Sequence, residues 1–232
     1  MTRIGSVPAL DTACEQYLAG RMALEKLELT ARQLRKQQWE QLRQSGAWPI
    51  YSNDQSWHDR ILDMCMTLGV IPARFRALQQ TLANPASPEL YFAMAYGYHK
   101  NGFDIEALKT ATWADGSHQY LVPEFEMSHP WRLLSPRCIR EFLEARNSGV
   151  LTQPLLTGPV TFLLCGNITS AGISQQQVLQ LLLPLYGELL QQLQKAGATE
   201  IAMPETEEAR AHPLYDMAYS YLRLHTTLPL LA

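Results

Sequence analysis

Short apolar segments with strand character alternate along this chain with longer segments of helical periodicity. Helical spacing is clearest over residues 24–42, which Ser45-Gly46 follows as a stop, over residues 57–69 and over residues 178–196. Strands that are joined by helices pair in parallel, so this alternation predicts an α/β fold with a parallel sheet. The strand candidates are centred near Arg3, Ile50, Leu121, Leu155, Ile201 and Leu224.

The length of the chain limits how far such a sheet can close. A closed barrel of eight parallel strands and eight helices takes about 250 residues, and this chain has 232. Helical insertions near Leu24 and Leu90 use part of that length. We therefore expect a single domain over residues 1–232 of the (β/α)8, or TIM-barrel, type that is incomplete, with about six strands. Because such a barrel has open edges, we also expect it to form homo-oligomers through them.

The shorter segments are less decisive. Residues 90–98 are rich in aromatic and small side chains and fit either a helix or a strand. Residues 139–146 predict a short helix, which Ser148-Gly149 ends. Residues 222–227 predict a last strand near the carboxyl terminus.

Charge and cysteine usage argue against several classes of protein. With 19 basic and 22 acidic residues the net charge is -3, which argues against a nucleic-acid-binding or membrane-anchoring surface. No apolar run reaches about 18 residues, and the amino terminus lacks the apolar region of a secretory signal, so we expect a soluble cytoplasmic protein. The cysteines are scattered singly and the histidines lack metal-binding spacing, so we expect core thiols and no metal site in this chain.

Some motifs are more specific than this periodicity. They are Arg3-Ile4-Gly5, Leu68-Gly69-Val70-Ile71-Pro72-Ala73-Arg74, Val122-Pro123-Glu124-Phe125 and Leu156-Thr157-Gly158-Pro159-Val160-Thr161. Together they resemble the amino-terminal domain of cobalamin-independent methionine synthase. The resemblance runs from about Arg3 to about Thr227, and the L-x-G-P-V-T block is its most specific part.

The resemblance implies a role as well as a fold. In that family two barrels face each other: the carboxyl-terminal barrel carries zinc, binds homocysteine and activates its thiol, and the amino-terminal barrel helps hold the polyglutamylated methyl-folate. The resemblance therefore implies a ligand of the 5-methyltetrahydrofolate type and a separate zinc-barrel partner. The chain would take part in methionine biosynthesis without catalysing alone, and it would carry no cofactor, because zinc belongs to the absent carboxyl-terminal domain.

This sequence also departs from the family pattern. Where the family has a basic motif that contacts the glutamate tail, this chain has Pro8-Ala9-Leu10-Asp11, and Thr112 takes the place of a lysine ahead of Trp113. Each exposed ion pair lost is worth up to about 1 kcal/mol, so polyglutamate binding should be weaker. A second hypothesis is therefore a non-catalytic, diverged paralogue that binds another small ligand or regulates a full-length synthase.

The candidate ligand-binding residues lie where barrel strands end, because loops at those ends hold ligands in such folds. No catalytic residue is expected in this chain. Structural alternatives remain open: the two aspartates could cap the helix near Trp57, Glu124 could pair with a cation such as Arg132, and the aromatic residues could serve packing. The candidates are Arg3, Asp54, Asp59, Trp113, Tyr120, Glu124 and Glu205.

Overall fold

The structure is a computed structural model that describes residues 2–3, 7–113 and 116–232. Helices and short strands alternate along the chain, as the periodicity predicts. The strands are β1 (Thr2–Arg3), β2 (Tyr51–Ser52), β3 (Thr110–Thr112), β4 (His118–Leu121), β5 (Glu124–Phe125), β6 (Gln153–Pro154), β7 (Asn167–Ile168), β8 (Ile201–Ala202) and β9 (Leu230–Leu231). The helices are α1 (Pro8–Leu18), α2 (Leu24–Gln44), α3 (Arg60–Leu68), α4 (Ala73–Thr81), α5 (Pro88–Tyr96), α6 (Arg137–Asn147), α7 (Pro159–Leu164), α8 (Gln175–Lys195), α9 (Glu207–Ala211) and α10 (Tyr215–His225).

Most strand pairs among the described residues are parallel. β2 pairs with β6 and β8 with β9, and a parallel bridge between Leu155 and Ala202 connects the two pairs into one row. β1 pairs with β4, and β5 pairs with β7, also in parallel. The hairpin of β3 and β4 is antiparallel. These pairings confirm the α/β fold, and the incomplete barrel of about six strands stays a prediction.

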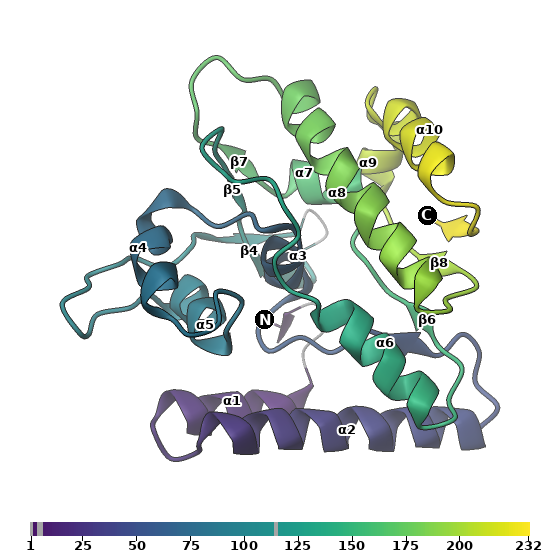
Figure 1. Cartoon of the computed structure of the whole chain (residues 1–232), viewed down its shortest axis with the longest axis horizontal. Coiled ribbons are helices and arrows are strands. Elements are labelled where there is room, and N and C mark those ends of the chain that lie inside the picture. The colour runs from purple at the N-terminus through teal and green to yellow at the C-terminus, as the bar shows by residue number, and fades with distance from the viewer. Residues whose placement is uncertain (1, 4–6, 114–115) are drawn as a thin grey trace.

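The helices form groups around these strands (Figure 1). The long helix α2 runs along one edge of the molecule with α1 against it, α4 packs against α5, and α6, α8 and α10 lie together on the other side. Ser174 begins α8 with a reciprocal capping box to Gln177. The leucine-rich face of α8 is buried against α7 and α10, which brings the loops after β6 and β8 close together.

Helix α3 lies at the centre of the fold, and both of its ends are fixed by specific contacts. At its start Asp59 accepts hydrogen bonds from the backbone N–H groups of Ile61 and Leu62. At its end Gly69 has a φ of 69°, and a Cβ atom there would lie 2.4 Å from the backbone oxygen of Arg132. The helix between these caps is almost wholly buried.

One strand prediction is wrong. Residues 222–227 do not form a strand, because α10 continues to His225 and the last strand is β9. Ala218, Tyr219 and Leu222 are buried at helical spacing, whereas Leu224 is 83% exposed, so the segment buries a helical stripe. The remaining predicted strands have counterparts in β1, β2, β4, β6 and β8, and the undecided segment 90–98 mostly forms α5.

The cysteine prediction is confirmed, since all four thiols are buried. Within the described part of the chain, no helix combines the length and the apolar character needed to span a bilayer.

Candidate functional site

Two cavities that share Arg60 and Pro204 form a groove at the carboxyl ends of β2, β6 and β8, which we call the strand-end groove. The first cavity has a volume of about 470 Å³, and the second, of about 760 Å³, extends along the strands to Asp54. The first is lined by Arg60, Ile61, Trp113, Ser117, His118, Thr157, Thr161, Pro204, Glu205 and Thr206. The groove therefore lies where loops of parallel α/β sheets place ligands.

Glu205 joins the two loops that form one wall of the groove. Its carboxylate accepts hydrogen bonds from the backbone N–H of Val160 at 3.0 Å, from the N–H of Thr161 at 2.6 Å and from the Tyr219 hydroxyl at 3.1 Å. Burial raises the pKa of Glu205 above its ordinary value, although these hydrogen bonds act in the opposite direction. The residue thus fixes the wall and presents a carboxyl group that keeps its proton to a higher pH than usual.

Gly158 explains why the L-x-G-P-V-T motif needs a glycine. A Cβ atom at this position would lie 2.2 Å from Cδ of Glu205. The glycine therefore lets the Glu205 carboxyl group reach the backbone N–H groups at the start of α7. The motif and Glu205, which are far apart in the sequence, form one structural unit.

Asp54 and Arg60 bring opposite charges to the groove without meeting. Asp54 accepts a hydrogen bond from Nε2 of Gln38 at 3.0 Å, and its other oxygen is buried without a partner. Burial raises the pKa of Asp54 to about 6. Arg60 has no ion pair or hydrogen bond from its side chain to any other described residue, and burial lowers its pKa. Among the described residues, the groove therefore holds a cation without a charged partner.

The described residues do not fit a metal ion. Among residues 2–3, 7–113 and 116–232 no group of three or more His, Cys, Asp or Glu side chains is placed to hold one. The groove itself offers single carboxyl groups on separate walls, so these residues do not provide a zinc centre.

Comparison with known proteins agrees with the motifs. A family model described as "Cobalamin-independent synthase, N-terminal domain" matches residues 1–227. The chain belongs to this family. The resemblance seen in the motifs is thereby confirmed.

Several curated relatives of this synthase family are named 5-methyltetrahydropteroyltriglutamate–homocysteine methyltransferase. The protein from Cytophaga hutchinsonii is 39% identical over 204 residues, which cover 88% of this chain and 26% of the relative. The protein from Xylella fastidiosa is 37% identical over 225 residues, covering 95% and 29%. The protein from Saccharomyces cerevisiae is 32% identical over 240 residues, covering 98% and 31%. The chain thus spans less than a third of the length of these relatives.

Of the residues predicted for the synthase-family pocket, Asp54, Trp113 and Glu205 line the groove. Trp113 packs on Tyr120 with ring centroids 5.2 Å apart, and its indole N–H is buried without a partner. Burial raises the pKa of Tyr120 to about 12. Tyr120 thus packs against Trp113 and does not line the cavity, as the packing alternative predicts. Trp113 itself lines the cavity.

Asp59 takes the structural role. It is fully buried, and besides capping α3 it accepts hydrogen bonds from the N–H of Leu121 at 3.2 Å and lies 2.9 Å from Nδ1 of His58. The carboxylate therefore ties α3 to β4 and has no part in the lining of either cavity. The capping alternative thus describes Asp59 but not Asp54.

Glu124 lies outside the lining of the groove. Glu124 pairs with Arg74, with Nη2 of the arginine 2.9 Å from Oε1, so its partner is Arg74 and not the suggested Arg132. Arg74 belongs to the LGVIPAR motif, so two synthase-family motifs meet in this ion pair. The backbone of Arg3 lies in β1, paired with Gln119 of β4.

Sequence reasoning missed Arg60. The residue is the first of α3, directly after the cap Asp59, and α3 is the first helix after β2. One signal could have revealed Arg60: it is a basic residue at the start of a helix that follows a strand. Such a position faces the carboxyl ends of neighbouring parallel strands.

Proposed function

We propose that this chain acts as the folate-side half of a methyl transfer from 5-methyltetrahydrofolate polyglutamate to homocysteine, and that it holds the methyl-folate in the strand-end groove. The observation that carries the proposal is that a match to the synthase family over residues 1–227 coincides with a groove that contains an aromatic wall and an arginine without an ion-pair partner among the described residues. The relatives named above carry this reaction in their names.

Three side chains give the groove its chemistry. Arg60 would pair with a glutamate carboxylate of the ligand, since a guanidinium binds carboxylates strongly where water is excluded. Trp113 would offer its indole face and its unpartnered N–H. Glu205 would hold the loops of β6 and β8 in place around the ligand, so the chain would contribute orientation and not a nucleophile.

The same proposal extends to the fold and the partner. We infer a wall of a (β/α)8 barrel in the row β2-β6-β8-β9, with its carboxyl ends toward the ligand. A separate zinc-bearing chain would supply activation of the homocysteine thiol, because the described residues of this chain offer no zinc ligand set. The pair of chains would then transfer the methyl group that neither transfers alone.

Titration calorimetry with 5-methyltetrahydrofolate triglutamate tests the binding part. The protein should bind the ligand, and Arg60→Gln should weaken binding about tenfold or more, because hydrogen bonds to charged groups are worth about 1.5–3 kcal/mol. Arg223→Gln, which makes the same charge change on the exposed side of α10, should bind as the unaltered protein does. No binding, or equal binding by Arg60→Gln, would overturn the placement of the ligand.

A reconstituted reaction tests the partner part. The chain is mixed with a separately produced zinc-bearing domain of a relative, and methionine formation is followed with methyl-folate triglutamate and homocysteine. The mixture should form methionine faster than the zinc-bearing domain alone. An unchanged rate, together with tight methyl-folate binding, would restrict the function to ligand holding.

A second candidate function is a non-catalytic module that binds a different small ligand. The observation in its favour is the loss of the family's basic contacts: Asp11 lies in the first turn of α1, and Thr112 ends β3 beside Trp113. Titration of an uncharged candidate ligand separates the two functions, because such a ligand would bind the Arg60→Gln variant as tightly as it binds the unaltered protein.

A further inference from the structure

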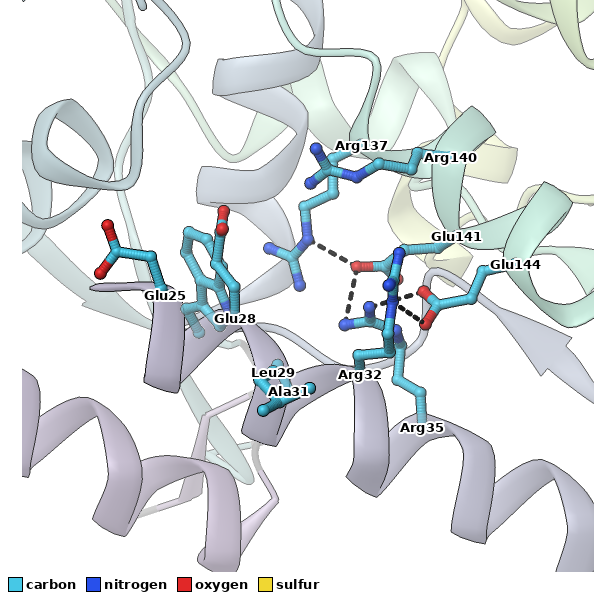
Figure 2. Close-up of a pocket in the computed structure, with 11 residues that line it drawn as sticks. Glu25, Glu28, Leu29, Ala31, Arg32, Arg35, Arg137, Arg140, Glu141 and Glu144 are labelled. Carbon is cyan, nitrogen blue, oxygen red and sulfur yellow. Dashed lines mark hydrogen bonds and ion pairs between the residues drawn. The ribbon is translucent and has the colours of Figure 1, made fainter. Parts of the chain in front are cut away.

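A cavity of about 270 Å³ lies between α2 and α6 (Figure 2), and we call it the helix pocket. The described residues that line it are different from those that line the strand-end groove. Its walls are dominated by charged side chains, with Trp57, Leu29 and Ala31 as the apolar part. The charged residues are Glu25, Glu28, Arg32 and Arg35 from α2, and Arg137, Arg140, Glu141 and Glu144 from α6.

The two helices carry complementary charge patterns. Along α2 two glutamates precede two arginines, and along α6 two arginines precede two glutamates. Successive residues of the α2 set are three or four positions apart, and the residues of the α6 set stand at positions i, i+3, i+4 and i+7, so each set occupies one face of its helix. Figure 2 shows the two faces opposite each other, with the glutamates of α2 at one end of the pocket and its arginines at the other.

One half of this arrangement is closed by ion pairs. Arg35 Nη2 lies 2.7 Å from Glu144 Oε2, Arg35 Nη1 lies 3.3 Å from Glu141 Oε1, and Arg32 Nε lies 2.9 Å from Glu144 Oε1. Arg137 is also committed, at 2.7 Å from Glu141 and 3.1 Å from Asp63. These contacts hold α2 and α6 at a fixed separation.

The other half stays open. Among the described residues Glu25, Glu28 and Arg140 form no ion pair, although Glu25 and Glu28 lie across the pocket from Arg140. Two carboxylates and one guanidinium thus face each other across a space that the closed half prevents from collapsing.

Buried polar atoms without partners border the same space. Trp57 is 6% exposed and lines the pocket, and its Nε1 has no hydrogen-bond partner. The same holds for Nε of Arg35 and for Oε2 of Glu141, whose residues are 7% and 1% exposed. Buried polar atoms almost always have partners in native proteins, so these atoms point to a ligand that both donates and accepts hydrogen bonds.

We propose that the helix pocket binds a free α-amino acid with an apolar side chain. Arg140 and the Trp57 N–H would bind its carboxylate, and Glu25 with Glu28 would bind its ammonium group. Its side chain would lie against Leu29 and Ala31 or enter a second cavity of about 160 Å³, which shares Glu28, Trp57, Arg137 and Arg140 with the first. A zwitterion is the chemical class that matches walls of opposite charge.

Titration calorimetry with L-leucine, L-methionine and L-valine tests this site on the full chain. At least one of them should bind with a Kd of about 1 mM or tighter. The N-acetyl derivative, which lacks the ammonium group, and the amide, which lacks the carboxylate, should each bind about tenfold more weakly or worse. No heat of binding from any of the three amino acids, or equal binding of a derivative, would overturn the proposal.

Variants locate the site. Arg140→Gln and Glu28→Gln change exposed residues and should each weaken amino-acid binding about tenfold or more. Arg43→Gln and Glu40→Gln make the same charge changes at the far end of α2, outside the pocket lining, and should leave the Kd unchanged. Unchanged binding by Arg140→Gln would place the amino acid elsewhere, which also overturns the proposal. Arg60→Gln should have no effect, which separates this site from the strand-end groove.

Discussion

The α2–α6 interface and the strand-end groove treat buried charge in opposite ways. At the interface Arg137 is bound by Asp63, by Glu141 and by the backbone oxygen of Gln55, and it stacks on Trp57 with its Cζ 4.7 Å from the ring centroid. In the groove Arg60 has no ion-pair partner among the described residues. Within the described residues, one region satisfies its arginine with ion pairs and the other does not.

The difference indicates that the paired charges of the interface stabilise the fold, whereas the arginine of the groove serves ligand binding. A buried charge with partners fixes the elements that carry those partners, and removing one partner leaves the others uncompensated. A partly buried charge without partners costs stability and is retained where a ligand can repay that cost. Substitutions in the two regions should therefore have different consequences, and the largest effect on stability belongs to the interface.

Arg137→Met should destabilise the protein by about 3–5 kcal/mol, because it leaves the buried Asp63 carboxylate without its cation and leaves Glu141 with Arg35 alone. Burial alone would lower the pKa of Arg137, but the neighbouring Glu141 and Asp63 raise it above its ordinary value, which shows how strongly the network favours the charge. Urea unfolding followed by circular dichroism measures the free energy of unfolding.

The control for this change is Arg43→Met. Arg43 is exposed and pairs with Glu40 on the surface of α2, so its loss should change the free energy of unfolding by less than about 1 kcal/mol. Equal effects of the two substitutions would show that the buried ion pairs of Arg137 contribute no more to stability than an exposed ion pair.

Gly158→Ala should have the next largest effect, and it sharpens the comparison from the side of the groove. The added Cβ would meet the Glu205 carboxyl group, and forcing an extra methyl group into a packed site costs about 1–3 kcal/mol. The cost should be much smaller in the background of Glu205→Ala, where the obstacle is absent. The unfolding free energies of the two single variants and the double variant give this coupling; additive effects would show that Gly158 and Glu205 are independent.

Local signals made much of the fold predictable. Ser45-Gly46 and Gly69 were sufficient to end α2 and α3, and the apolar segments near Leu155 and Ile201 mark β6 and β8. Such features depend on neighbours in sequence, so a single chain displays them. The segment over residues 222–227 was predicted wrongly because its alternating leucines fit a strand as well as the exposed and buried sides of a helix end.

The site was less predictable because its contacts are non-local. The sequence places Asp54, Trp113 and Glu205 near strand ends. It does not show that Asp59 accepts a hydrogen bond from β4 or that Glu124 forms an ion pair with Arg74. The network of Arg137 joins three helices, and a charged residue on a helix face gives no sign of burial by itself. The synthase-family motifs were informative because their residues form such contacts, as Gly158 does beside Glu205 and Arg74 does with Glu124.

The smallest effect expected concerns Asp54, and it is a change with pH. The pKa of Asp54 is raised from 3.8 to about 6 by burial, with Glu141 acting in the same direction and Arg60 and Gln38 in the other. A folded state with the higher pKa binds the proton more tightly than the unfolded chain. The contribution of Asp54 to stability is therefore fully present below about pH 4 and is lost as the pH rises through about 6.

Asp54→Asn imitates the protonated carboxyl group at every pH, so the variant should not show this loss. Its free energy of unfolding should equal that of the unaltered protein near pH 4 and exceed it by about 1 kcal/mol at pH 7, a modest figure because Asp54 keeps some contact with solvent. Asp216→Asn on the exposed side of α10 should show no such growth with pH. A difference for Asp54→Asn that is the same at both pH values would mean that the groove does not hold this carboxyl group in a poorly solvated environment, and Asp54 would then resemble the ion-paired carboxylates of the interface.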